Sequence, residues 1–223
     1  MRHLSETGIV LSLRLVRESD LILSLLTKEK GKLVAIAPGA RRSRKRFPGG
    51  IDLFDFGNFE LSTPKTEGQL YVLDGISGKE GLLSMNGELW RFPFASSCLE
   101  IADNFSPEGD PECGKLCVTL RAILKALSDA ESVEQCFAFC TFFFLVVLRV
   151  SGFDLLEHDA ELPPTQRQWF QEMLRVKAPI IPYDPDTGYE GFACVLQRTE
   201  ETLGCPLRSG KRSDLRKLRT ATR

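Results

Sequence analysis

The chain has 223 residues, of which 43% are hydrophobic and 26% are charged. This length and composition suit one or two globular domains with a sizeable core, and they exclude wholesale disorder. The net charge of −1 is unevenly distributed. Residues 1–81 carry 13 Lys and Arg against 10 Asp and Glu, residues 82–206 carry 9 against 19, and residues 207–223 carry 7 against 1. Such asymmetry favours an anionic partner that meets only part of the molecule.

The start of the chain is polar, and Arg14 and Arg17 interrupt the first apolar run, so we expect no signal peptide. The longest apolar run, between Gln135 and Arg149, has 13 residues, whereas a bilayer takes about 20, and it predicts a buried core helix. Seven cysteines without a CxxC motif are typical of reduced thiols in a cytoplasmic protein. The cysteines in apolar helical stretches are expected to act as small core residues: Cys98, Cys136 and Cys140.

Five short strands are predicted in the first third of the chain. Residues 8–37 contain three apolar segments separated by turn residues, and two further strands are expected at 54–61 and 69–73. Five strands with a long loop favour a small antiparallel β-barrel. The glycine-rich segment 75–81 is interpreted as a linker that ends this domain.

The long loop carries the strongest functional signal in the sequence. Five of the six residues 41–46 are cationic, and Gly and Pro flank them, which indicates an exposed and mobile loop. Phosphates of a nucleic acid would neutralise these charges, and Phe47 directly after them could stack on an unpaired base. A solvated loop without a ligand is the alternative interpretation.

From residue 82 onward the spacing of apolar residues becomes helical. Helices are predicted over 89–105, 117–127 and 133–150, with Ser132 as a cap of the third, and shorter ones over 166–176, 195–203 and 214–218. Residues 178–188 are expected to form loop and turn. The fold class is therefore α+β, with a barrel over residues 1–79 and a helical domain over 80–223.

No enzyme motif is complete. Gly78-Lys79 lacks the Ser or Thr of a phosphate-binding loop, and Asp184 to Gly188 has neither the glycine nor the glutamate position of a calcium loop. An Asx-type turn accounts for Asp184. With only two histidines and scattered carboxylates, neither a nucleophilic pair nor a nuclease metal site is indicated, and we expect a protein that is not an enzyme.

Two further basic features are candidates for binding. The segment 207–223 could extend a DNA track or be a solvated tail, and these alternatives are equally favoured. Arg121 and Lys125, beside Leu120, Ile123 and Leu124, could border a groove for an apolar peptide with a terminal carboxylate. Core packing with solvated cations is the favoured alternative there.

The order of several segments resembles the RecO family. Gly8 to Leu11, Glu18 to Asp20, Leu26 to Lys32, the loop Gly39 to Phe47 and Leu53 to Phe56 match its N-terminal region. A weaker similarity continues at 148–153 and at 206–212, with Lys211 and Arg212 in the basic motif.

The resemblance implies an N-terminal OB-fold and a helical C-terminal domain. It implies binding of single- and double-stranded DNA, annealing without ATP, and a role in DNA repair and recombination in the bacterial cytoplasm at the nucleoid. It also implies help in loading recombinase, a RecR-like partner and contact with the C-terminal tail of single-stranded-DNA-binding protein. No cofactor and no membrane are implied.

This sequence departs from the family at two places. Many members hold zinc with four cysteines, but Ala160, Pro163 and Gln197 occupy three of those positions and only Cys194 remains. One ligand cannot form a closed tetrahedral site, so no zinc site is expected. Pro38 stands where a basic residue is frequent, which removes one charge and one backbone donor.

We therefore expect a DNA-binding mediator, with a protein–protein adaptor whose barrel does not bind nucleic acid as the alternative. The candidate DNA-binding residues are Arg14, Arg17, Lys30, Lys32, Arg41, Arg42, Arg44, Lys45, Arg46, Phe47, Arg208, Lys211, Arg212 and Arg216.

Overall fold

The computed structural model describes residues 3–63, 66, 70–83, 88–159 and 161–209. Their contacts divide the chain into two compact units. The first, here the barrel unit, comprises residues 1–82 together with Ser106–Arg121, and the second, the helical unit, comprises Leu83–Phe105 and Ala122–Arg223. Strands followed by helices make the chain an α+β protein, as expected.

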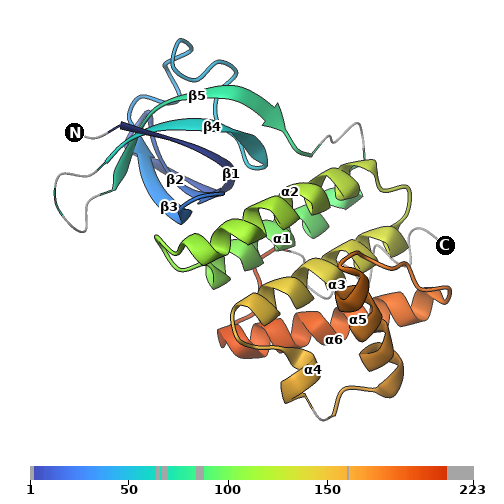
Figure 1. The fold of residues 1–223 in the computed structure, drawn as a ribbon. Helices are drawn as coiled ribbons and strands as arrows, with labels where there is room; N and C mark the ends of the chain where they lie inside the picture. The colour runs from blue at the N-terminus through green and yellow to red at the C-terminus, as the bar shows by residue number, and fades with distance from the viewer. Residues whose placement is uncertain (1–2, 64–65, 67–69, 84–87, 160, 210–223) are drawn as a thin grey trace. The chain divides into compact units, whose positions relative to one another are not determined.

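Five strands form the barrel unit's sheet (Figure 1). They are β1 (His3–Val16), β2 (Asp20–Thr27), β3 (Gly31–Ala37), β4 (Asp55–Ser62) and β5 (Tyr71–Gly81). The order β1-β2-β3-β5-β4 closes on itself, and β3–β5 is the one parallel pairing among the described strands. Alternate residues face inward because strand side chains alternate, so Val10, Leu23, Leu25, Phe59 and Leu61 are buried together.

The interpretation of residues 75–81 as a linker is wrong, because they extend β5. Phe59 pairs with Ile76 and Phe56 pairs with Glu80, with register shifts between Phe56 and Asn58. Gly78 adopts a φ of +59°, which glycine tolerates without a steric cost. The glycines therefore permit an irregular strand, rather than ending the domain.

The barrel unit includes a segment distant in sequence. Gly109 N–H donates to the Lys32 carbonyl at 2.9 Å. Gly31 has a φ of +65°, and a Cβ there would lie 1.9 Å from the Asp110 carbonyl oxygen, so only glycine permits this approach. The short 3-10 helix η2 (Pro111–Cys113) and the first half of α2 (Gly114–Asp129) follow in the same unit.

The helical unit is built around α3 (Val133–Val150), which packs on α1 (Phe92–Phe105) and α6 (Pro185–Leu203). The 3-10 helix η1 (Leu89–Arg91), the short α4 (Leu155–His158) and α5 (Pro164–Val176) complete it (Figure 1). Among the described residues, α3 is the helix that is both long enough and apolar enough to span a membrane. Most of it is buried inside the protein. The predicted core helix is thus confirmed.

Side-chain caps mark the starts of several helices, among them α3 and α6. The Ser132 hydroxyl accepts from Gln135 N–H at 3.3 Å, as predicted for α3. The Asp184 carboxylate accepts from the N–H groups of Asp186 and Thr187, which confirms the turn. That turn also starts α6, ten residues before the helix expected at 195.

The cysteines are free thiols. Cys98 and Cys140 are fully buried with their Sγ atoms 3.6 Å apart, and Cys136 is buried beside them, as expected for core residues. Burial raises the pKa of Cys140 well above its usual value and the pKa of Cys117 to about 12. These thiols therefore remain protonated and are poor nucleophiles.

Candidate nucleic-acid interface

The loop between β3 and β4 is a series of hydrogen-bonded turns. Ser43 N–H donates to Gly39 O at 2.9 Å, and Phe47 N–H donates to Ser43 O at 3.1 Å. Arg41 N–H donates to Ser19 O at 3.1 Å, which joins this loop to the β1–β2 turn. We call the β1–β2 turn and residues 38–54 together the loop end of the barrel. The expectation of a mobile loop did not account for these turns.

The five cations of the loop divide into two groups. Arg42 Nη2 lies 2.9 Å from Glu18 Oε2, and Arg46 donates to the Pro38 carbonyl while its guanidinium lies 5.1 Å from the Phe47 ring centroid. All five are exposed. The side chains of the other three make neither an ion pair nor a hydrogen bond within the part of the chain that the structure describes: Arg41, Arg44 and Lys45. These three cations are therefore available to an anionic ligand.

Phe47 is not available for stacking, and that expectation is wrong. The side chain is 1% exposed and packs in the barrel core with Ile51, Phe59 and Leu73. The sequence places an aromatic residue directly after the basic run, but the turn ending at Phe47 directs its ring inward. Phe47 therefore anchors the loop, while the cations before it face solvent.

Two of the remaining predicted cations share the loop end. Arg14 is exposed near the end of β1, where it pairs with Ile22. Arg17 is exposed in the following turn with a φ of +59°, 3.9 Å from Asp20 Oδ2. Because Asp20 Oδ1 accepts from Gly39 N–H at 2.8 Å, this turn is held against the loop.

Lys30 and Lys32 lie at the other end of the strands. β2 has eight residues and separates the β1–β2 turn from the turn that carries Lys30. At 3.3 Å per residue, this separation is about 25 Å. Lys32 is also half-buried, and its backbone forms an isolated parallel β-bridge with Glu108. The structure thus does not bring these two lysines together with the basic loop.

The remaining basic candidates form no site with the loop within the described residues. Arg121 Nη2 lies 3.1 Å from Glu80 Oε2, and its guanidinium lies 4.1 Å from the Phe56 ring centroid. The apolar residues expected to line a groove beside Arg121 and Lys125 are buried: Leu120, Ile123 and Leu124. The peptide groove is therefore wrong, and core packing is the correct alternative.

In the C-terminal segment, the backbone N–H of exposed Arg208 donates to Glu100 Oε1 at 2.7 Å. Lys211, Arg212 and Arg216 lie outside the described residues, so their place in a DNA track stays a prediction.

Lys79 is a residue that the sequence analysis missed. Its Nζ donates to the Gly50 carbonyl at 3.1 Å and lies 3.2 Å from Asp55 Oδ2. Through these interactions Lys79 links the end of the basic loop to β5. The hypothesis of a linker over 75–81 hid this role, because a linker would not place Lys79 beside the loop.

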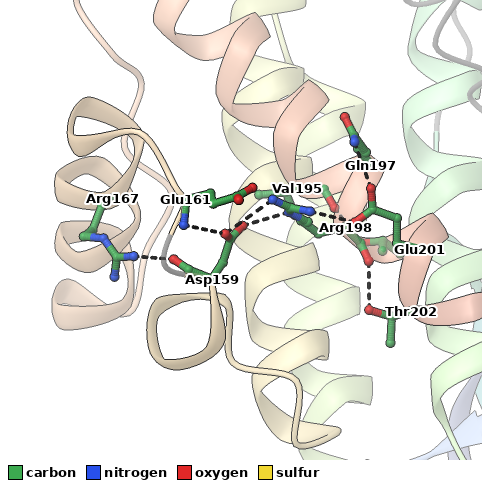
Figure 2. A network of polar contacts seen from close by, with 9 residues as sticks. Asp159, Glu161, Arg167, Val195, Gln197, Arg198, Glu201 and Thr202 are labelled. Carbon is green, nitrogen blue, oxygen red and sulfur yellow. Dashed lines mark hydrogen bonds and ion pairs between the residues drawn. The ribbon is translucent and has the colours of Figure 1, made fainter.

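The residues at the family's zinc positions do not fit a zinc ion. Pro163 and Gln197 offer no thiolate, Ala160 carries no ligand atom, and Cys194 alone provides sulfur. No group of three metal-ligating side chains occurs among the described residues. A polar network instead joins the two segments that bear these positions, as Figure 2 shows.

Asp159 and Arg198 form the centre of this network. Asp159 Oδ2 accepts from Arg198 Nε at 2.7 Å, and Oδ1 accepts from Arg198 Nη2 at 3.3 Å. Arg198 also lies 2.8 Å from Glu201 Oε2, and this bond lowers the pKa of the Glu201 carboxyl. Asp159 is 10% exposed and Arg198 32% exposed, so the bidentate pair is partly shielded from water.

We expect Asp159→Ala to lower the free energy of unfolding of the helical unit by about 1–3 kcal/mol, because it removes the two hydrogen bonds that Arg198 donates to Asp159 and leaves Arg198 with Glu201 alone. Chemical denaturation followed by tryptophan fluorescence measures this, since Trp90 and Trp169 both lie in the helical unit. Glu172→Ala, which breaks an exposed pair with Arg175, is the control and should cost less than about 1 kcal/mol. A chelator should leave the melting temperature unchanged, and a decrease would contradict the expectation that this protein holds no structural metal.

Comparison with known proteins defines the class of the barrel unit. Residues 1–81 match the family model described as "Recombination protein O N terminal". The chain is 35% identical over 130 residues to the DNA repair protein RecO of Anaeromyxobacter dehalogenans, covering 58% of this chain and 50% of that protein. It is 33% identical over 140 residues to the RecO protein of Syntrophobacter fumaroxidans, covering 62% and 54%.

A third relative, the DNA repair protein RecO of Syntrophus aciditrophicus, is 32% identical over 146 residues, covering 66% of this chain and 54% of that protein. The matched part of the chain thus spans about half the length of these curated relatives. The barrel carries a RecO N-terminal domain. Over residues 1–81 the chain therefore belongs to the RecO family, and the similarity to the curated RecO proteins extends beyond them.

Proposed function

We propose that this protein acts in bacterial DNA repair and homologous recombination by binding DNA at the loop end of the barrel and annealing complementary strands without ATP. The observation that carries the proposal is the group of three exposed cations, Arg41, Arg44 and Lys45, whose side chains make neither an ion pair nor a hydrogen bond among the described residues, on a loop held in place by turns. Like charges repel one another, and phosphates offset that repulsion while releasing counterions.

The barrel topology supports this proposal. Strand order β1-β2-β3-β5-β4, with a parallel β3–β5 pair, supports the OB-fold that the family resemblance implies, a barrel used widely to bind single-stranded nucleic acid. Arg14 and Arg17 extend the basic surface from the loop to the β1–β2 turn. The phosphates would follow this line of cations, with most bases of the strand left free to pair.

Annealing requires that two strands approach with their charges screened. A basic surface that does not read sequence provides this screening, and no nucleophile or general base takes part. The protein would therefore be a mediator in the cytoplasm, at the nucleoid, and not an enzyme. By family resemblance, its further partners would be a RecR-like protein and the C-terminal tail of single-stranded-DNA-binding protein, and it would help to load recombinase.

An annealing assay tests the proposal. We expect the protein to accelerate pairing of complementary strands coated with single-stranded-DNA-binding protein, without ATP. The acceleration should fall when the coating protein lacks its C-terminal tail. If the protein neither shifts labelled single strands at low salt nor speeds annealing of bare strands, it is a protein–protein adaptor whose barrel does not bind DNA.

A further inference from the structure

The loop end of the barrel encloses a hollow of about 510 Å³. This volume lies within the range of ordinary small-ligand sites, roughly 300–1,000 Å³. Apolar side chains that line it include the half-buried Leu21 and the buried Ile51, and exposed side chains that line it include Arg41, Arg44 and Asp52. The hollow thus combines an apolar floor with a charged rim.

The charged side chains at the rim of the hollow make no hydrogen bond or ion pair among the described residues. Arg41 and Arg44 belong to the cations without an ion-pair partner, as described above. The backbone of Asp52 bonds to Asp55, but its carboxylate oxygens have no partner among the residues that the structure describes. Two guanidinium groups and one carboxylate therefore face the same hollow with donors and acceptors unassigned.

A bare phosphate does not suit this set of groups. It would leave the apolar floor uncovered, and the Asp52 carboxylate would repel it. A nucleotide suits all three parts, because its base covers apolar surface, its phosphates pair with arginines, and a base amino group can donate to a carboxylate. We propose that the hollow receives one unpaired nucleotide of a bound single strand, with the base inside, its amino group on Asp52, and its flanking phosphates on Arg41 and Arg44.

The carboxylate sets a preference among bases. Cytosine carries an amino donor at the ring position where thymine carries a carbonyl acceptor. The Asp52 carboxylate accepts a hydrogen bond from the cytosine amino group and repels the thymine carbonyl. The barrel therefore favours cytosine over thymine at this one position, although the rest of the strand is held through its phosphates.

This inference rests on the proposed DNA binding, and the following measurement separates the two. Fluorescence anisotropy compares deoxycytidine and thymidine oligomers of equal length with a deoxyribose-phosphate oligomer that lacks bases. We expect the unmodified protein to bind the cytidine oligomer about five- to tenfold more tightly than the thymidine oligomer. The baseless oligomer should bind more weakly than either.

Asp52→Asn should bring the ratio of the two affinities close to one, because the amide offers a donor as well as an acceptor. The same change removes a negative charge and should raise binding of the thymidine oligomer. Glu29→Gln, an exposed change outside the hollow, is the matched control and should leave the ratio unchanged.

An unaltered ratio in Asp52→Asn, or equally tight binding of the baseless oligomer, would overturn the nucleotide hollow and leave DNA binding by the loop intact. If none of the oligomers binds the unmodified protein at low salt, the proposed function fails, and this inference fails with it.

Discussion

Replacing Arg41, Arg44 and Lys45 together with alanine is expected to weaken single-stranded DNA binding by about two orders of magnitude at low salt. These are the loop cations whose side chains make neither an ion pair nor a hydrogen bond among the described residues, so their charge is free to displace counterions from the strand. Each lost phosphate contact lowers the slope of log K against log salt by about 0.7, so the triple variant should lose about 2. A salt titration by fluorescence anisotropy measures both quantities.

Two control variants test whether the loss of affinity comes from the charges of these three residues. Arg41→Lys with Arg44→Lys preserves the charges and should keep the salt slope. Arg42→Ala with Arg46→Ala should have a smaller effect, because Arg42 is already paired with Glu18 and Arg46 with the Pro38 carbonyl. If the triple alanine variant binds with the original slope, the loop is not the DNA contact.

Phe47→Ala is expected to lower the free energy of unfolding of the barrel by about 3–5 kcal/mol, because it opens a cavity in a closely packed core. Trp90 and Trp169 lie in the helical unit, so their fluorescence does not report on this loss. Hydrogen exchange of the β2 and β4 amides should instead show faster local opening.

Phe47→Leu distinguishes a core residue from a base-stacking residue. Leucine keeps most of the buried volume but has no aromatic face, so we expect a folded protein with nearly unchanged DNA affinity. A stacking role would instead predict normal stability with an affinity loss of about 1–3 kcal/mol, as aromatic replacement gives in single-strand binders. That second outcome would contradict the burial of Phe47 in the barrel.

Local patterns were sufficient for much of the fold. Alternating apolar residues predicted the first three strands, and the apolar run between Gln135 and Arg149 predicted the central helix. Both predictions succeeded because the spacing of apolar residues depends only on neighbours in the sequence. Ser132 was identified as a cap for the same reason, since its partner Gln135 is three residues away. The basic loop was visible as a charge run at 41–46.

The order and spacing of several weak motifs also determined the family. No single segment was diagnostic, but the series from Gly8 to Phe56 resembled RecO, and the match of residues 1–81 to that family bears this out. Family membership is a property of the sequence, so it required no coordinates. It did not show which of the basic residues share a surface.

Only the tertiary structure decided how these residues are used. Pairing with β4 made residues 75–81 a strand and brought Lys79 to the loop, 30 residues away in sequence from Gly49. The turn at Phe47 buried an aromatic ring that its sequence neighbours suggested was exposed.

The same structure separated cations that the sequence had grouped. It neutralised Arg42 with Glu18 and placed Lys30 at the opposite end of β2 from the basic loop. Charge runs and periodicity depend on adjacent residues, whereas burial, pairing and surface sharing depend on contacts between residues far apart in the chain. The sequence therefore determined that this protein is a RecO-family barrel and helical unit with a basic loop, and the fold decided which three cations of that loop remain free for a ligand.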